Sequence, residues 1–120
     1  MIRSVDVALT DESLSGSWLS TRLGVGTQRL DAMRRAGELL GVRRPGGHDF
    51  LYPAWQFAPD GKPRPVIRQL VTTARGAGMS DERLYEVLAG RTGLSGDARL
   101  ADALRDGRDD YVLSVVRAAG

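Results

Sequence analysis

The chain has 120 residues, 17 basic and 15 acidic side chains, a formal net charge of +2 and no cysteine. This length suits one domain, or two very small ones that share a core, and the lack of cysteine excludes a disulfide framework and a thiolate metal site. No apolar run approaches the ~20 residues that cross a bilayer, and acids interrupt the short N-terminal apolar stretch, so we expect a soluble, cytoplasmic protein.

The N-terminal part of the chain predicts one short helix. Residues 1–14 are ambiguous, because SVDVAL alternates as a strand does but is short, so we expect a weak arm or a short first element. Ser15 or Ser17 can cap the helix that follows. The residues expected on its inner side are Trp18, Leu19 and Leu23.

A glycine turn then leads to a second helix. Gly24 is expected to end the first helix, and Thr27 to cap the next. Leu30 and Met33 would face inward, and Gly37 would follow the helix end. The side chains expected to face outward are Gln28, Arg29, Asp31, Arg34 and Arg35. Two short helices, a tight glycine turn and a basic outer face on the second helix are typical of a helix-turn-helix.

The next segment has the pattern of a β-hairpin. Apolar residues at 39–42 and 50–52 flank the turn sequence PGGH at 45–48. Pro53 would end the second strand, because proline donates no hydrogen bond to a ladder. A hairpin that directly follows the second helix of a helix-turn-helix is a wing.

The stretch FLYPAWQF, residues 50–57, holds four of the seven aromatic side chains. A stacking platform for bases needs basic residues between its aromatics, and this stretch has none. A ligand pocket is a second interpretation. We expect the aromatics mainly to fill the core where the wing meets the C-terminal region.

The C-terminal region predicts a small helical bundle. The proline-rich stretch APDGKPRP, residues 58–65, would be a turn-rich joint. About four short helices follow, the second capped by Ser80. The expected fold class is therefore mainly α with a small β-hairpin. Its parts are a winged helix-turn-helix DNA-binding region (1–57), the joint (58–65), and a helical region for partner binding or dimerisation (66–120).

Catalytic chemistry has little support in the sequence. His48 is the single histidine, and no second histidine or cysteine exists to complete a metal site. The chain contains no GxSxG elbow, no GxxxxGK[ST] loop and no GxGxxG loop. We expect no enzyme activity, no metal and no cofactor.

The distribution of charge favours DNA binding. Residues 22–44 hold six arginines and two acids, residues 62–75 hold four basic residues and no acid, and residues 80–120 hold six arginines and eight acids. Arginine binds phosphate and guanine edges bidentately, although GC-rich codon usage would also enrich it. The expected DNA contacts are Thr27, Gln28 and Arg29 to bases, Arg34 and Arg35 to phosphates, and Arg43, Arg44 and His48 in the wing.

The segments AGELLGV (36–42) and YPAWQF (52–57), followed by a proline-rich turn, resemble the Xre/MbcA/ParS-type antitoxins and regulators of bacteria, and related actinobacterial winged-helix regulators. The C-terminal GDARLADALRDGRDDYVLSVVRAA is also similar to the ending of that family, with Leu100 where proline is usual. The resemblance implies a homodimeric DNA-binding autorepressor whose C-terminal helices bind a partner, a RES-type toxin or a second copy. The implied partner-binding residues are Arg99, Leu104 and Tyr111.

Two other functions remain open on the sequence. The acidic C-terminal third and the small net charge fit a protein-interaction adaptor that does not bind DNA. An excisionase or MerR-like architectural protein would share the winged fold and bend its DNA.

Overall fold

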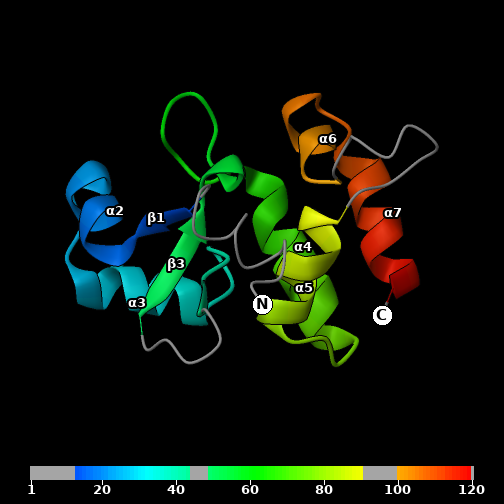
Figure 1. The fold of residues 1–120 in the computed structure, drawn as a ribbon, viewed down its shortest axis with the longest axis horizontal. Helices are drawn as coiled ribbons and strands as arrows, with labels where there is room; N and C mark the ends of the chain where they lie inside the picture. The colour runs from blue at the N-terminus through cyan, green and yellow to red at the C-terminus, as the bar shows by residue number, and fades with distance from the viewer. Residues whose placement is uncertain (1–12, 44–48, 91–99, 120) are drawn as a thin grey trace, which may run out of the picture.

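A winged helix-turn-helix and a helical bundle make up the computed structural model, which describes residues 13–43, 49–90 and 100–119 (Figure 1). The helices are α2 (Gly16–Leu23), α3 (Thr27–Arg35), α4 (Pro65–Gly76), α5 (Asp81–Ala89), α6 (Asp102–Arg105) and α7 (Asp109–Ala119). The strands are β1 (Ser13–Ser15), β2 (Val42–Arg43) and β3 (Phe50–Pro53), and a 3-10 turn, η1 (Ala54–Gln56), follows β3. The predicted fold class, mainly α with a small β-hairpin, is confirmed, and β1 extends the hairpin to a three-stranded sheet.

The turn between α2 and α3 forms for local reasons. Gly24 ends α2 with a φ of 70°, a left-handed conformation that favours glycine. The Ser20 hydroxyl then donates to the Val25 carbonyl and closes the turn. At the start of α2, the Ser15 hydroxyl accepts from the Trp18 amide at 3.2 Å, as one of the two predicted caps.

Two predictions about these helices are wrong. Trp18 is 51% exposed, so Leu19 rather than the tryptophan buries the inner side of α2. The N-cap of α3 is Gly26, and Thr27 is the first residue inside the helix. Because glycine has no side chain, α3 begins without the side-chain cap that we expected from Thr27.

The sheet has β3 in its centre, with β1 and β2 antiparallel on either side. Leu14 of β1 pairs with Tyr52, and Val42 of β2 pairs with Leu51. The hairpin of β2 and β3 is the predicted wing, and Pro53 is the last residue of β3. The stretch SVDVAL, residues 4–9, lies outside the described residues. The strand on the other edge of β3 is β1, which begins at Ser13 and was not predicted as such.

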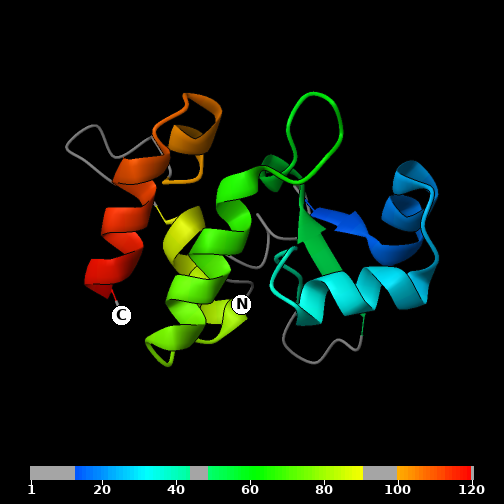
Figure 2. The ribbon, with the colours of Figure 1, turned by 180° about the vertical axis from the view of Figure 1, so that it is seen from behind.

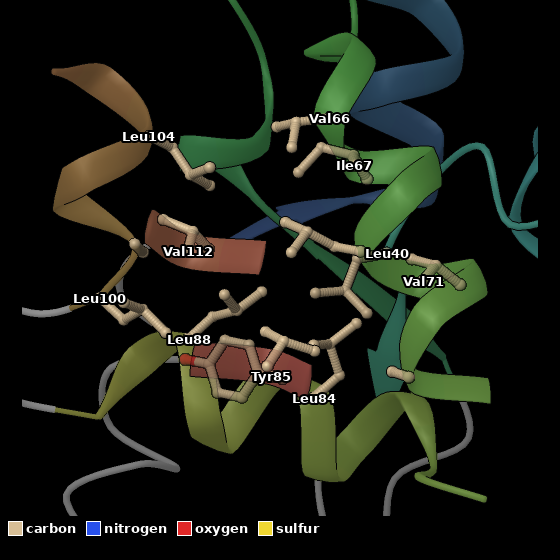
Figure 3. Packing of buried hydrophobic residues seen from close by; sticks show 14 of the residues in the cluster. Leu40, Val66, Ile67, Val71, Leu84, Tyr85, Leu88, Leu100, Leu104 and Val112 are labelled. Atoms are coloured by element: carbon tan, nitrogen blue, oxygen red, sulfur yellow. The ribbon is translucent and has the colours of Figure 1, made fainter. Parts of the chain in front are cut away.

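Two hydrophobic clusters meet at β3 and at the segment before β2. The smaller cluster joins the helix-turn-helix to the sheet, and its buried members are Leu19, Leu30, Leu39 and Tyr52. The larger cluster fills the bundle, where α4 packs against α5 and α7 (Figure 3). Neighbouring residues divide between them: Leu39 packs in the smaller cluster and Leu40 in the larger. The two clusters are therefore joined through the backbone at Leu39 and Leu40, directly before β2.

The aromatic stretch 50–57 lies at this junction. Phe50 and Tyr52 pack in the smaller cluster, as the two-residue period of a strand predicts. Trp55 is 7% exposed and belongs to the larger cluster, where its ring stacks on Tyr85 with 6.3 Å between centroids. The side chains thus fill the core on both sides of the junction, as expected, and no open stacking surface exists among them.

Gln56 fixes the junction with hydrogen bonds. Its side chain is fully buried, its Oε1 accepts from the Leu40 amide at 2.7 Å, and its Nε2 donates to the Leu40 carbonyl at 2.8 Å. The same Nε2 donates to the Pro53 carbonyl at 3.1 Å. One amide side chain therefore binds three backbone groups, and it is the partner of the buried Leu40 amide and carbonyl.

A β-carbon at Gly41 would disrupt the packing of α3 on the wing. It would lie 2.7 Å from Arg34 Cδ and 2.8 Å from Tyr52 Cε1, and the tyrosine is buried. We expect Gly41→Ala to lower the free energy of unfolding by about 1–3 kcal/mol, measured by urea denaturation. The matched variant is Gly76→Ala, because a β-carbon there meets nothing within 4 Å. Equal stability of both variants would contradict this packing.

Candidate nucleic-acid interface

Helix α3 presents one uncovered face. Its inward residue Leu30 is 1% exposed, and Met33 packs beside it. The exposed residues recur at helical spacing on the opposite side: Thr27, Gln28, Arg29, Ala32, Arg35 and Ala36. Ala32 in the middle of this face and Ala36 at its C-terminal end are small, so a partner can approach the helix backbone closely.

The polar end of this face is its N-terminal end. Thr27, Gln28 and Arg29 are all exposed in the first turn, as predicted. The first amides of a helix have no acceptor within the helix, and Gly26 provides no side-chain acceptor. Amides in this position, with the positive end of the helix dipole, favour an anion. The end of α3 therefore combines hydrogen-bonding side chains with a preference for negative charge.

Arg34 is not the outward-facing phosphate contact that we predicted. Its side chain is 15% exposed, and its guanidinium carbon lies 3.6 Å from the centroid of the Phe50 ring. Its Nη2 lies 3.4 Å from Asp31 Oδ1. The pKa of Tyr52 beneath it is raised by burial, against the lowering effect of its hydrogen bond to Arg34. Arg34 therefore packs α3 on the sheet. Arg34 follows Leu30 by four residues and therefore lies on the same side of the helix. This spacing could have predicted that Arg34 faces the sheet.

The described part of the wing adds one arginine to the interface. Arg43 is exposed, and its guanidinium carbon lies 5.1 Å from the centroid of the Phe50 ring. The aromatic ring thus supports both Arg34 and Arg43 by cation–π contacts. Arg44 and His48, the other predicted wing contacts, lie outside the described residues.

The C-terminal end of α3 is held by a residue that sequence reasoning missed. Arg75 of α4 donates from Nη1 to the Arg35 carbonyl at 2.8 Å and from Nη2 to the Arg34 carbonyl at 3.1 Å. It also binds the Asp81 carboxylate, with Nε at 3.1 Å and Nη2 at 2.9 Å, and this bond raises its pKa. The fork of one guanidinium therefore joins the bundle to the last turn of α3.

The predicted partner-binding residues do not form one surface. Leu104 is 1% exposed and points into the larger cluster (Figure 3), so it is a core residue and the prediction of a partner contact is wrong. Tyr111 is 38% exposed, beside the Arg108 guanidinium at 4.6 Å. Arg99 lies outside the described residues.

The described residues contain neither a metal cluster nor a membrane-spanning helix. No three or more histidine, cysteine, aspartate or glutamate side chains within residues 13–43, 49–90 and 100–119 come together as a metal site would require. In the same ranges, no helix combines the length and apolar character that a membrane span needs.

Comparison with solved structures finds a similar chain, Rv2175c, whose structure was determined by NMR. The two share a TM-score of 0.78 over 89% of this chain and 80% of that chain, at 23% sequence identity. At this identity the likeness shows the fold, a helical domain with a small sheet. No family model matches the chain, and no curated protein matches it.

Proposed function

We propose that the protein is a sequence-specific regulator that binds double-stranded DNA with the exposed face of α3 in the major groove. The observation that carries this proposal is the uncovered face of α3, which begins with Thr27, Gln28 and Arg29 at its N-terminal end. The recognition helices of helix-turn-helix proteins contact base edges with this end. Glutamine can bind adenine bidentately, and arginine can bind guanine.

Electrostatics support the same surface. Asp31 is the carboxylate within α3; its side chain is 49% exposed and is paired with Arg34 at 3.4 Å. Arg29 and Arg35 are exposed on the outer side, and α3 offers no further carboxylate to pair with them. The charge left facing solvent is positive. Arg43 extends it to the wing, where winged proteins contact the flanking backbone. Affinity would then depend strongly on salt, because each neutralised phosphate releases counterions.

Selection from a pool of duplexes with a randomised core tests this proposal. We expect the parent protein to enrich one motif. Arg29→Ala should lose discrimination at one guanine of that motif by about 1–3 kcal/mol, which is roughly 5- to 150-fold in relative affinity. Arg117→Ala, an exposed arginine on α7, is the matched control and should select as the parent does. An Arg29→Ala protein with unchanged preference would overturn the assignment of α3.

The resemblance to bacterial antitoxins further suggests that this regulator acts as an antitoxin. In that role the bundle would bind a toxin or a second copy. Of the two predicted partner-binding residues that the structure describes, Tyr111 is the exposed one. Binding of random duplex separates the regulator from the adaptor, since an adaptor would not bind DNA even at low salt. Circular permutation of a selected site would detect the strong bending of an architectural protein.

A further inference from the structure

We infer that the DNA-binding surface continues from α3 onto the exposed edge of α4, where Arg68 contacts a backbone phosphate beside the C-terminal end of α3. This inference rests on the proposed function and adds a contact outside the winged helix-turn-helix. Figure 2 shows α3 and α4 together on one side of the molecule, with the end of α3 next to α4.

The side chains of α4 show which edge adjoins α3. Arg75 binds the carbonyls of Arg34 and Arg35, one turn after Val71. A β-carbon at Gly37, directly after α3, would lie 3.4 Å from Val71 Cγ1. Val71 and Arg75 therefore face the end of α3.

Arg68 lies on this same edge. It precedes Val71 by three residues and Arg75 by seven, and positions with these spacings align along one side of a helix. At 1.5 Å per residue, Arg68 stands about 10 Å along the axis from Arg75. Its side chain is exposed, whereas Ile67 and Leu70 beside it are buried in the larger cluster.

The charge of this edge is uncompensated at Arg68. Arg75 is neutralised by Asp81, with 2.9 Å between Nη2 and Oδ2. Within the described ranges of the chain, Arg68 has no carboxylate partner, and Val66–Gly76 contains no acid. Gln69 and Thr72 add exposed hydrogen-bonding groups next to it. An anion is thus the ligand that this edge favours.

The anion that fits this edge is a backbone phosphate of the DNA that α3 binds. A duplex that receives α3 in its groove has a phosphate backbone on both sides of the helix, and the backbone at the C-terminal end of α3 would meet Arg35 and then Arg68. The hydrogen bonds of Arg75 hold the end of α3 against α4, so the position of α4 relative to α3 is restrained. Contacts of this kind position the protein and carry no sequence information.

The salt dependence of binding to a random-sequence duplex of about 20 base pairs tests the inference. Loss of one phosphate contact should reduce the slope of log K against log salt by about 0.9. We expect Arg68→Ala to show this reduction and weaker binding to every duplex alike, and Arg68→Lys to keep most of the slope. The control Arg117→Ala should keep the parental slope. Circular dichroism and the melting temperature verify that each variant is folded.

The outcomes separate the inference from the proposed function. If the parent and Arg29→Ala both fail to bind duplex at low salt, the proposed function is wrong. If Arg29→Ala changes the sequence preference while Arg68→Ala keeps the parental slope and affinity, the contact on α4 does not exist and the function of α3 stands. A reduced slope in Arg117→Ala as large as in Arg68→Ala would also contradict the inference, because it would show a diffuse effect of charge.

Discussion

Replacing Gln56 with leucine should lower the free energy of unfolding by at least about 2 kcal/mol, because two buried backbone groups lose their partner and each such loss costs roughly 1–3 kcal/mol. Leucine has a similar volume, so the variant tests the hydrogen bonds rather than the packing. The groups are the amide and the carbonyl of Leu40. The carbonyl of Pro53 also loses a bond from Nε2, but it keeps the backbone bond that begins η1. Small domains have a total stability of about 5–15 kcal/mol, so this loss is large.

Urea denaturation followed by circular dichroism measures the effect. The matched control is Gln69→Leu, since Gln69 is exposed on α4 and its replacement should change stability by about 0.5 kcal/mol or less. A Gln56→Leu protein as stable as the control would contradict the role of Gln56 as the residue that joins η1 to the segment before β2.

Trp55→Ala should be destabilised by about 3–5 kcal/mol, the usual cost of truncating a large buried aromatic side chain. The ring is 7% exposed and stacks on Tyr85, so its loss leaves a cavity at the junction of the two clusters. Trp55 lies in the core and not on the exposed face of α3, and for this reason the variant should bind DNA as the parent does wherever it is folded.

Two measurements check this expectation: the melting temperature, and the duplex affinity at a temperature below it. Trp18→Ala is the matched tryptophan control, because Trp18 is 51% exposed and should change stability by about 0.5 kcal/mol or less. A Trp55→Ala protein of parental stability that no longer binds duplex would place Trp55 in the binding surface instead of the core.

Local sequence signals predicted the elements well where one residue decides the local conformation. Gly24 and Gly37 have positive φ angles of 70° and 83°, as helix-ending glycines do. Ser80 caps α5 through its side chain, as its position before two acids indicated. Pro53 ends β3. These outcomes depend on neighbours in the sequence, so no knowledge of tertiary contacts was needed.

Predictions failed where a tertiary contact decides the position of a side chain. Arg34 was expected at phosphates, but its long side chain covers Phe50 and Tyr52. Its spacing from Leu30 indicated the inward direction, whereas the two aromatic residues beneath it depend on the tertiary fold. Arg75 was counted only as basic charge, whereas its hydrogen bonds reach residues about forty positions away. Leu104 was assigned to a partner through a resemblance, although its burial follows from the apolar spacing with Leu100.

An NMR titration of the 15N-labelled protein, with a duplex selected from the randomised pool, tests most directly whether α3 is the surface that binds DNA. We expect the largest changes in amide chemical shift in α3, at residues 27–36, followed by the exposed edge of α4 around Arg68. Amides of α7 should change little. Changes concentrated in α7, with α3 unaffected, would contradict the assignment of α3 as the surface that binds DNA.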